Sequence, residues 1–314
     1  MKGIIMAGGE GSRLRPLTCD LPKPMVPVMN KPVMAYSIEL LRRYGIHEIG
    51  VTLQYRPEQI MDHFQDGSEY GVRIHYYIEE TPLGTAGSVK NTGDFLDQPF
   101  VVISGDALTD INLEKAVIFH KKKGSAATLV LKRVDIPLEY GVVVTDELGA
   151  IVRFLEKPSW GEVFSDTVNT GIYILEPEVL DYFEAGRKFD FSQDLFPLLL
   201  KDGQPMYGYI SDGYWCDIGN SFTYLTAHYD MLSDKVNHTF DAYESHKNIH
   251  LGKGVKIDEK AILQGPCFIG DYSRIEKGAV IGPYTVLGSH CVIELQYVIR
   301  LWPAIGLQFM KVQL

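Results

Sequence analysis

Residues Gly3–Val28 read GIIMAGGEGSRLRPLTCDLPKPMVPV, and the apolar run at the start of this stretch predicts a buried β-strand. Three glycines, Gly8, Gly9 and Gly11, follow the strand at once. Glycine permits a sharp turn in which several backbone N–H groups point into one hollow, and such a hollow binds phosphate oxygens. The spacing matches neither the P-loop nor the dinucleotide fingerprint, so the glycines alone are equally compatible with an ordinary turn.

Positive charges follow the glycines and complete a longer ordered pattern. Arg13 comes just after Gly11, and Lys23 stands between two prolines. An anion-binding loop followed by cations suits a nucleoside triphosphate. The pattern G-G-x-G-x-R-L-x-P-L-T, followed by P-K-P, resembles the signature of the sugar-1-phosphate nucleotidylyltransferases, and later segments resemble the mannose-1-phosphate guanylyltransferases among them. The resemblance implies that the nucleotide is bound by Arg13, Lys23, Ala7, Gly8, Gly9 and Gly11.

Two acidic residues lie where metal ligands are expected. Asp106 follows an apolar strand predicted at 100–103, and open α/β sheets bind ligands at the carboxyl ends of such strands. Asp217 lies between apolar neighbours in the segment YWCDIG. From the residues alone, Asp106 could instead cap the next turn, and Asp110 is a second candidate ligand. The resemblance implies that Asp106 and Asp217 bind Mg²⁺, for which carboxylates are suitable hard ligands.

The segment EETPLGTAG, residues 79–87, predicts a turn followed by the start of a helix. A helix N-terminus can bind a negative group or a base edge, although a capped helix start is the simpler interpretation. The resemblance places this segment in the base pocket, where Glu79 or Glu80 could accept hydrogen bonds from guanine, and its PLGTAG sequence resembles the guanylyltransferases. The implied nucleotide contacts are Glu79, Pro82, Leu83, Gly84 and Thr85.

A predicted antiparallel hairpin presents residues for the second substrate. Its strands are expected at 140–144 and 151–155, with a turn between them. The hairpin leads into Lys157, which could belong to an ordinary surface. The resemblance implies instead that Lys157 contacts the sugar phosphate. It further implies sugar contacts by Gly141, Glu156, Asn169 and Gly171.

Helical and strand-like segments alternate through most of the chain, and the spacing of apolar residues distinguishes them. Helices are predicted at 33–44, 57–64 and 113–123, and strands at 48–55, 72–78 and 100–103. Such β-α-β alternation predicts an α/β fold with a Rossmann-like, mostly parallel sheet flanked by helices. We expect this nucleotidyltransferase domain to span residues 1–236.

After residue 236 an aliphatic residue recurs at every sixth position. The repeat comprises Leu251, Ile257, Leu263, Ile269, Ile275, Ile281, Leu287 and Ile293. This period is typical of a parallel β-helix, in which each hexad forms one side of a coil. The domain 237–314 is therefore predicted to be a short β-helix of hexapeptide repeats, left-handed by the resemblance. After Ile293, Tyr297 and Pro303 replace the small residue of the repeat, so we favour a truncated repeat over an improvised cap.

Composition narrows the class of protein. The 314 residues carry a net charge of −10, which disfavours a general nucleic-acid binder. Four scattered cysteines form no C-x-x-C pair, which argues against a zinc site or a disulfide framework. The N-terminus does not resemble a signal peptide, and no apolar run reaches transmembrane length. We expect a soluble cytoplasmic protein without a nucleic-acid or membrane partner, and a homo-oligomer assembled through the β-helix.

The resemblance implies an enzyme that transfers a nucleotidyl group from a nucleoside triphosphate to a sugar 1-phosphate, with Mg²⁺ as cofactor and pyrophosphate as the second product. GTP and mannose 1-phosphate are the expected pair. The alternatives are a glucose-1-phosphate thymidylyl- or uridylyltransferase and a non-catalytic regulatory relative. Hexapeptide repeats also occur in acyltransferases, but no catalytic histidine stands out in this sequence.

Overall fold

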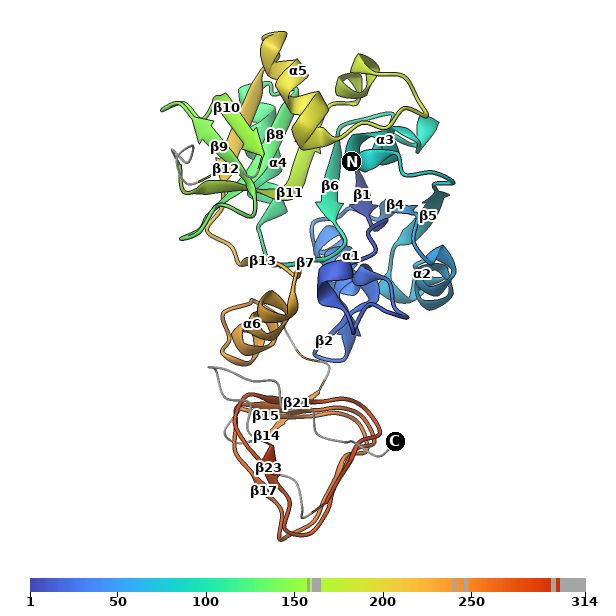
Figure 1. The fold of residues 1–314 in the computed structure, drawn as a ribbon, viewed down its shortest axis with the longest axis vertical. Helices are drawn as coiled ribbons and strands as arrows, with labels where there is room; N and C mark the ends of the chain where they lie inside the picture. Colours follow the sequence, from blue (N-terminus) through green and yellow to red (C-terminus); the bar gives the residue numbers. More distant parts are fainter. Residues whose placement is uncertain are drawn as a thin grey trace. The chain divides into compact units, whose positions relative to one another are not determined.

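The computed structural model describes residues 1–156, 159, 165–238, 240, 242–245 and 248–294, together with the backbone of 298–299. The chain forms two compact units, shown in Figure 1, and each is assembled from two segments. The first consists of Met1–Val26 and Val33–Gly219, and the second of Pro27–Pro32 and Asn220–Leu314. Helix α6 (Ser221–Leu232) thus groups with the second unit, whereas the sequence suggested a first domain that extends to residue 236.

Nine strands of the described residues form the sheet of the first unit, in the order β10-β9-β11-β6-β1-β4-β5, with β8 paired to β11 and β12 paired to β8 (Figure 1). Four neighbouring strands are parallel, namely β1 (Lys2–Met6), β4 (Glu48–Leu53), β5 (Arg73–Ile78) and β6 (Phe100–Ser104). The others are β8 (Ala127–Arg133), β9 (Gly141–Thr145), β10 (Ile151–Glu156), β11 (Thr167–Leu175) and β12 (Met206–Ile210). Strand β11 is antiparallel to β6, β8 and β9.

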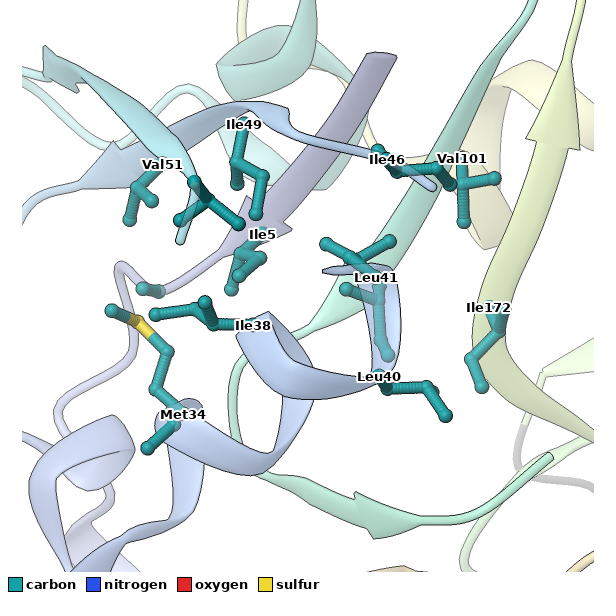
Figure 2. Packing of buried hydrophobic residues seen from close by; sticks show 14 of the residues in the cluster. Ile5, Met34, Ile38, Leu40, Leu41, Ile46, Ile49, Val51, Val101 and Ile172 are labelled. Atoms are coloured by element: carbon teal, nitrogen blue, oxygen red, sulfur yellow. The ribbon is translucent and has the colours of Figure 1, made fainter. Parts of the chain in front are cut away.

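Helices cover both faces of this sheet. They are α1 (Val33–Arg43), α2 (Pro57–Phe64), α3 (Gly84–Lys90), α4 (Leu113–Lys123) and α5 (Phe196–Lys201). Successive residues of a strand point to opposite faces. Ile5 and Val101 accordingly join an apolar cluster with α1, α2 and α4 (Figure 2), whereas Ile4 and Val102 join a second cluster with α3 and α5. The predicted α/β fold with a mostly parallel central sheet between helices is confirmed.

Short elements complete the first unit. The short 3-10 helices of the described residues are η1 (Ser12–Leu14), η2 (Lys23–Met25), η3 (Ser68–Tyr70), η4 (Gly93–Phe95) and η6 (Pro177–Tyr182), and η7 (Phe191–Leu195) is a π-helix. Strands β7 (Ala107–Thr109) and β13 (Trp215–Asp217) pair antiparallel in a separate ribbon. The sequence did not predict this ribbon, because three residues are too few to show a period. Within the described residues, no helix combines the length and apolar character needed to cross a membrane.

The second unit contains the predicted β-helix. One face is formed by β15 (Ile249–Leu251), β18 (Cys267–Ile269) and β21 (Thr285–Leu287), the next by β16 (Lys256–Ile257), β19 (Arg274–Ile275) and β22 (Val292–Ile293), and the third by β17 (Ile262–Leu263), β20 (Val280–Ile281) and β23 (Val298–Ile299). The short strand β14 (Tyr243–Ser245) is antiparallel to β15.

The hexad aliphatics stack inside these coils. In the register of the parallel pairs, Ile269 lies opposite Leu287, so three hexads complete one coil. Ile275 and Ile281 are almost fully buried, whereas Ile257 in the first coil is 38% exposed because only one neighbouring coil covers it. The predicted hexapeptide β-helix is confirmed. The left-handed sense of the β-helix stays a prediction. Whether the repeat is truncated or ends in an improvised cap concerns residues outside those described.

A hairpin of β2 (Pro27–Val28) and β3 (Lys31–Pro32) packs against α6 within the second unit. The Tyr224 hydroxyl donates to the carbonyl of Pro27 (2.9 Å), and His228 Nδ1 lies 3.4 Å from the sulfur of Met29. His228 is buried, and burial lowers its pKa to about 4. An imidazole that stays neutral in the folded protein makes stability depend on pH.

We predict that the second unit loses stability as the pH falls from about 6.5 to about 4, because the unfolded chain protonates His228 before the folded protein does. The loss levels off below the folded-state pKa. Between pH 7 and pH 5, the free energy of unfolding should fall by about 2 kcal/mol less in His228→Phe than in the wild type. Urea denaturation followed by circular dichroism measures this difference. The exposed-residue control His290→Asn should keep the wild-type dependence. An unchanged pH dependence in His228→Phe would contradict the prediction.

Candidate active site

Asp106 is placed at the end of β6 by the glycine that precedes it. The Gly105 N–H donates to the carbonyl of Met6 (2.9 Å) and ties the turn after β6 to the end of β1. A Cβ on residue 105 would lie 3.1 Å from that carbonyl oxygen and 3.1 Å from Ile5, so a larger residue would push the turn away. The Asp106 carboxylate therefore lies at the carboxyl edge of the parallel strands. There it accepts a hydrogen bond from Ser104 Oγ, a contact that sequence reasoning missed.

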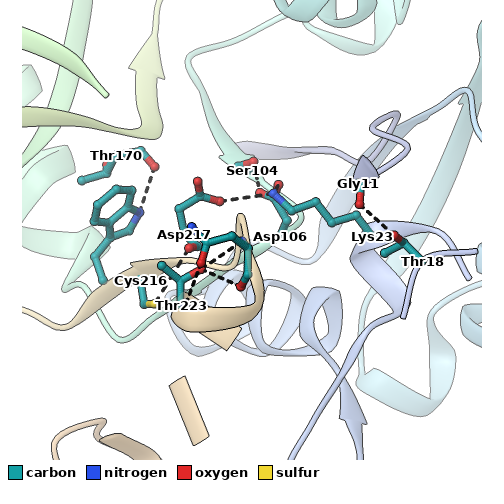
Figure 3. A network of polar contacts seen from close by, with 11 residues as sticks. Gly11, Thr18, Lys23, Ser104, Asp106, Thr170, Cys216, Asp217 and Thr223 are labelled. Carbon is teal, nitrogen blue, oxygen red and sulfur yellow. Dashed lines mark hydrogen bonds and ion pairs between the residues drawn. The ribbon is translucent and has the colours of Figure 1, made fainter. Parts of the chain in front are cut away.

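The β7–β13 ribbon brings Asp217 beside Asp106 from a distant part of the chain. Ala107 lies opposite Asp217 in the antiparallel register, and the Ile218 N–H donates to the carbonyl of Asp106 (3.2 Å). Trp215 Nε1 donates to the carbonyl of Thr170 (3.0 Å), which anchors β13 to β11 (Figure 3). Backbone pairing thus places Asp217 beside Asp106.

Lys23 lies between the two carboxylates, as Figure 3 shows. Its ammonium forms a short ion pair with Asp106 and lies 3.3 Å from Asp217 Oδ1. The lysine stem packs against Gly11, where φ is 68° and a Cβ would lie only 2.9 Å from Lys23 Cβ. Thr18 Oγ1 donates to the carbonyl of Gly11 (2.7 Å) and holds this loop. Glycine is therefore required at position 11 both for its backbone conformation and for the approach of Lys23.

These charged groups shift one another's proton affinities. Burial by itself would raise the pKa of Asp106, but the attraction of Lys23 and the hydrogen bonds from Lys23 and Ser104 hold that pKa below its usual value. Burial, and then the negative charge of Asp106, raise the pKa of Asp217 against the opposing effect of Lys23. Burial would lower the pKa of Lys23, but the two carboxylates raise it. The site therefore holds a charged ammonium between acidic groups that favour a cation.

The rest of the glycine loop borders this cluster. Arg13 lies in η1, and its guanidinium is 3.4 Å from the place that a Cβ on Gly219 would take, close to Asp217. Ala7 is buried, and its N–H donates to the carbonyl of Thr52 (2.9 Å). At Gly8 a Cβ would make only an ordinary contact of 3.4 Å, and at Gly9 a Cβ would meet no atom of the described residues within 4 Å. Packing thus requires glycine at position 11 and leaves room around Gly9.

The predicted base segment begins at Glu79, directly after β5. The Glu79 N–H donates to the carbonyl of Leu53 (2.8 Å), and Glu79 Oε2 accepts a hydrogen bond from the Leu83 N–H (3.0 Å), so the carboxylate spans the turn. Burial raises the pKa of Glu79, and the hydrogen bond from Leu83 opposes this effect. The side chain of Leu83 is buried, whereas Glu80 and Pro82 are exposed. Of the two candidate glutamates, Glu79 is the one fixed in place.

Gly84 and Thr85 are engaged by contacts within the protein. Gly84 has φ 71°, and a Cβ there would lie 2.7 Å from the carbonyl oxygen of Phe189. Thr85 Oγ1 donates to Asp190 Oδ2 (2.7 Å). Both residues therefore hold the base segment in place. Sequence reasoning missed Asp190, which lies outside every motif that carried the resemblance.

The predicted sugar-side residues that the structure describes lie on β9, β10 and β11. Gly141 and Glu156 are opposite each other in the hairpin, and a Cβ on Gly141 would lie 2.8 Å from Glu156 Oε2. Asn169 Oδ1 accepts a hydrogen bond from the N–H of Gly171 (3.0 Å), whose φ is 75°. Lys157 lies outside the described residues, so its contact with the sugar phosphate stays a prediction.

Strand order places the two predicted substrate sides on opposite flanks of β6. The sugar-side strands β9, β10 and β11 lie on one flank, whereas β1 and β5, which lead into the glycine loop and the base segment, lie on the other. Ligands of α/β sheets bind beyond the strand ends. A nucleotide and a sugar phosphate bound at these two sets of residues would therefore meet at Asp106, beside Lys23 and Asp217.

Comparison with known proteins identifies the family of this chain. Residues 2–234 match the family described as Nucleotidyl transferase. The chain belongs to this family. A nucleotidyl transferase is an enzyme that moves a nucleotidyl group, and relatives of this chain are named as glucose-1-phosphate uridylyltransferase and mannose-1-phosphate guanylyltransferase. These matches support sugar-1-phosphate nucleotidyltransferase activity, a step of nucleotide-sugar biosynthesis.

Similarity extends over most of the chain. This chain is 41% identical over 310 residues to UTP–glucose-1-phosphate uridylyltransferase of Synechocystis sp.. The match covers 93% of this chain and 80% of that protein. The chain is 33% identical over 293 residues to mannose-1-phosphate guanylyltransferase of Mycobacterium tuberculosis, with coverage of 93% and 79%. A crystal structure of a putative glucose-1-phosphate thymidylyltransferase from Bacillus anthracis in complex with sucrose matches with a TM-score of 0.68 at 27% identity, over 76% of this chain and 98% of that chain.

The paired aspartates of this nucleotidyl transferase suit a hard divalent cation. Mg²⁺ is commonly bound by one or two carboxylates and completes its coordination with waters and substrate phosphates. Asp106 and Asp217 offer such a pair, and the described residues contain no cluster of three or more histidines, cysteines or acids that could enclose a metal. Asp110, the second candidate, instead accepts a hydrogen bond from the Tyr214 N–H (2.6 Å).

We predict that Lys23→Met destabilises the ligand-free enzyme by about 3 kcal/mol, because it leaves two largely buried carboxylates without the ammonium between them. Adding Asp106→Asn to this variant should recover part of the loss, since it removes one of the repelling charges. Urea denaturation in the presence of a chelator measures both effects. Arg133→Met, which breaks an exposed ion pair with Asp166, is the control and should change stability by less than about 1 kcal/mol. Equal stability of Lys23→Met and Arg133→Met would contradict the predicted role of Lys23.

Proposed function

We propose that this enzyme transfers GMP from GTP to mannose 1-phosphate and so makes GDP-mannose and pyrophosphate. The observation that carries the proposal is the cluster of Lys23, Asp106 and Asp217 between a nucleotide flank and a sugar flank of one sheet. A phosphate oxygen of the sugar 1-phosphate attacks the α-phosphorus, and the bond from that phosphorus to the oxygen bridging to the β-phosphate breaks. Pyrophosphate leaves with that oxygen on the side opposite the attack.

Electrostatics and positioning are sufficient for this reaction. The attacking phosphate oxygen is already ionised, so the reaction needs no protein nucleophile and no general base. Asp106 and Asp217 would hold Mg²⁺, which when bound supplies positive charge to the triphosphate. Arg13 and Lys23 bind the triphosphate from the glycine-loop side, and Lys157 holds the sugar phosphate. These cations offset the repulsion between the two anionic substrates and the charge that develops on pyrophosphate.

The choice of guanine rests on Glu79. Guanine presents two adjacent N–H donors, N1–H and N2–H, and a carboxylate has the lone pairs to accept both. Glu79 is half-buried and fixed at its turn through Leu83, which leaves its second oxygen for a base. Uracil and thymine offer only one N–H donor on the corresponding edge. The guanylyltransferase named among the relatives supports the same base, and mannose is proposed from the same similarity.

UTP with glucose 1-phosphate is the second candidate pair. It is favoured by the relative from Synechocystis sp., which is named for that pair and is 41% identical to this chain. The chemistry at the phosphates would be the same, and only the base contacts and the recognition of the sugar 2-hydroxyl would differ.

We further propose a cytoplasmic homo-oligomer. The hexad coils support this idea, because an open β-helix coil leaves apolar side chains and parallel strand edges that a second copy can cover. Ile262, on the outer side of its coil, is 53% exposed.

For the substrate pair, we predict a higher kcat/KM for GTP than for UTP, dTTP or ATP at fixed mannose 1-phosphate, measured by pyrophosphate release. Glu79→Gln should reduce kcat/KM for GTP by about tenfold or more and affect UTP less, because the amide keeps only one acceptor oxygen, which cannot serve both the Leu83 N–H and the base. The control is Glu80→Gln at the exposed neighbouring residue, which should change kcat/KM for GTP little. A preference for UTP or dTTP would refute the guanylyl proposal, and a preference for glucose 1-phosphate would change the product only.

For the metal site, we predict that Asp106→Asn and Asp217→Asn each lower turnover by about two orders of magnitude or more, because each removes a ligand and its charge. Binding of Mn²⁺ in the presence of the nucleotide, followed by electron paramagnetic resonance, should weaken in parallel. Asp66→Asn is the control, since this exposed carboxylate only caps a turn at Ser68. Near-normal turnover of either active-site variant at saturating Mg²⁺ would exclude that residue as a ligand.

A further inference from the structure

Residues 187–190 pack against the base segment, residues 79–87, through backbone contacts. The N–H of Phe189 donates to the carbonyl of Leu83 (2.8 Å), and the N–H of Gly87 donates to the carbonyl of Phe189 (2.9 Å). A Cβ on Gly84 would lie 2.7 Å from the Phe189 oxygen, and a Cβ on Gly87 would lie 2.7 Å from the oxygen of Arg187. The two glycines of the PLGTAG segment therefore permit close backbone packing, which explains their presence without a ligand.

Thr85 and Asp190 form the polar part of this junction. Thr85 Oγ1 donates to Asp190 Oδ2 (2.7 Å) and accepts a hydrogen bond from the Phe191 N–H (2.9 Å). The hydroxyl thus uses its proton and one lone pair within the protein. Its contacts serve to fix the first turn of α3 on the segment that contains Asp190.

The other oxygen of Asp190 fixes the turn that follows. Asp190 Oδ1 accepts hydrogen bonds from the N–H groups of Ser192 (2.8 Å) and Gln193 (3.1 Å), while the Asp190 N–H donates to Asp194 Oδ2 (2.8 Å). These bonds cap η7, the single π-helical turn. Such turns are uncommon and occur frequently at functional sites. A single carboxylate therefore holds both α3 and η7.

The turn fixed by Asp190 reaches the sugar flank. Ser192 Oγ lies 3.5 Å from Asn169 Nδ2, which also donates to the hydroxyl of Tyr173 (2.9 Å). Asn169 Oδ1 accepts the N–H of Gly171 (3.0 Å) and shapes the backbone of β11 there. A continuous series of contacts consequently runs from Thr85 on the nucleotide flank, through Asp190 and Ser192, to Asn169 on the sugar flank.

We propose that Asp190 is a positioning residue that holds the nucleotide-base segment and the sugar-side strand β11 in one fixed relation, with Thr85 and Ser192 as its two arms. The inference rests on the proposed transfer between a nucleotide and a sugar 1-phosphate. In-line attack requires the reacting atoms to be held about 3–3.5 Å apart, so an anchor shared by both substrate sides acts on the rate without touching either substrate.

Measuring KM and kcat with each substrate varied separately tests the contacts of Thr85 and Ser192 independently. Thr85→Val should raise the KM for the nucleoside triphosphate by about five- to tenfold and leave the KM for the sugar 1-phosphate within about twofold. Ser192→Ala should do the reverse, with a smaller rise because its contact is longer. Asp190→Asn should raise both KM values and lower kcat, because it loses the acceptor for Thr85 and disturbs the cap of η7. Asp146→Asn is the matched control, since Asp146 Oδ1 accepts two backbone N–H groups, those of Leu148 and Ala150, in the turn between β9 and β10.

Hydrogen exchange of the ligand-free protein tests the same junction without activity. Asp190→Asn should speed amide exchange in both 83–87 and 169–171, whereas Asp146→Asn should leave both segments at the wild-type rate. Faster exchange in only one segment, or unchanged KM values in a variant that is merely less stable, would overturn the proposal and reduce Asp190 to a helix cap. A wild-type enzyme inactive with every substrate pair would refute the proposed function, and the exchange result would still decide whether Asp190 joins the two segments.

Discussion

One lysine keeps two largely buried carboxylates together, and the arrangement of the active site depends on this contact. Two neighbouring carboxylates repel each other strongly in a medium of low polarity, so a cation between them stabilises the pair. Lys23 supplies that cation in the ligand-free protein, where it contacts Asp106 and Asp217 together. The close approach of the lysine stem explains why Gly11 has no side chain. The glycine loop therefore positions the positive charge of Lys23.

Under the proposed function, the strand order makes this cluster the place where the two substrates meet. Asp106 follows β6, with the nucleotide-side strands β1 and β5 on one flank and the sugar-side strands β9, β10 and β11 on the other. The parallel part of the sheet directs its strand ends toward one edge. The antiparallel part adds β11 beside β6 and brings Asn169 and Gly171 to the other flank. In the proposed reaction, this mixed sheet would place two anionic substrates on either side of one acidic pair, with the cations Arg13 and Lys23 beside the triphosphate.

The second unit is built on a different principle. Each β-helix coil contacts only its neighbours, so its core is a stack of hexad side chains rather than a packing of distant elements. The buried aliphatics Ile269, Ile275 and Ile281 share one cluster for this reason. The hairpin 27–32 and α6 pack within the same unit, although they come from opposite ends of the nucleotidyl transferase region matched at 2–234. The limits of the sequence family and the limits of compact packing are therefore not the same.

Local signals in the sequence were sufficient for much of this structure. The six-residue repeat specified the β-helix, because a solenoid depends on contacts between neighbouring repeats. The spacing of apolar residues located α1, α2 and α4 and the strands between them, since helices and strands bury one face at different periods. Ordered motifs predicted that Lys23, Asp106 and Asp217 are functional, and the structure brings these three side chains into contact.

Only the tertiary structure decided which of these segments meet. The position of β11 between β6 and β9, and the ribbon that pairs Ala107 with Asp217, result from hydrogen bonds between parts of the chain far apart in sequence. Asp190 illustrates the same limit, because an aspartate in an irregular segment has no period and acquires its role only when Thr85 lies 2.7 Å away. A residue pattern reports burial and local conformation. The choice of distant partners depends on how the whole core packs, and no local pattern encodes that choice.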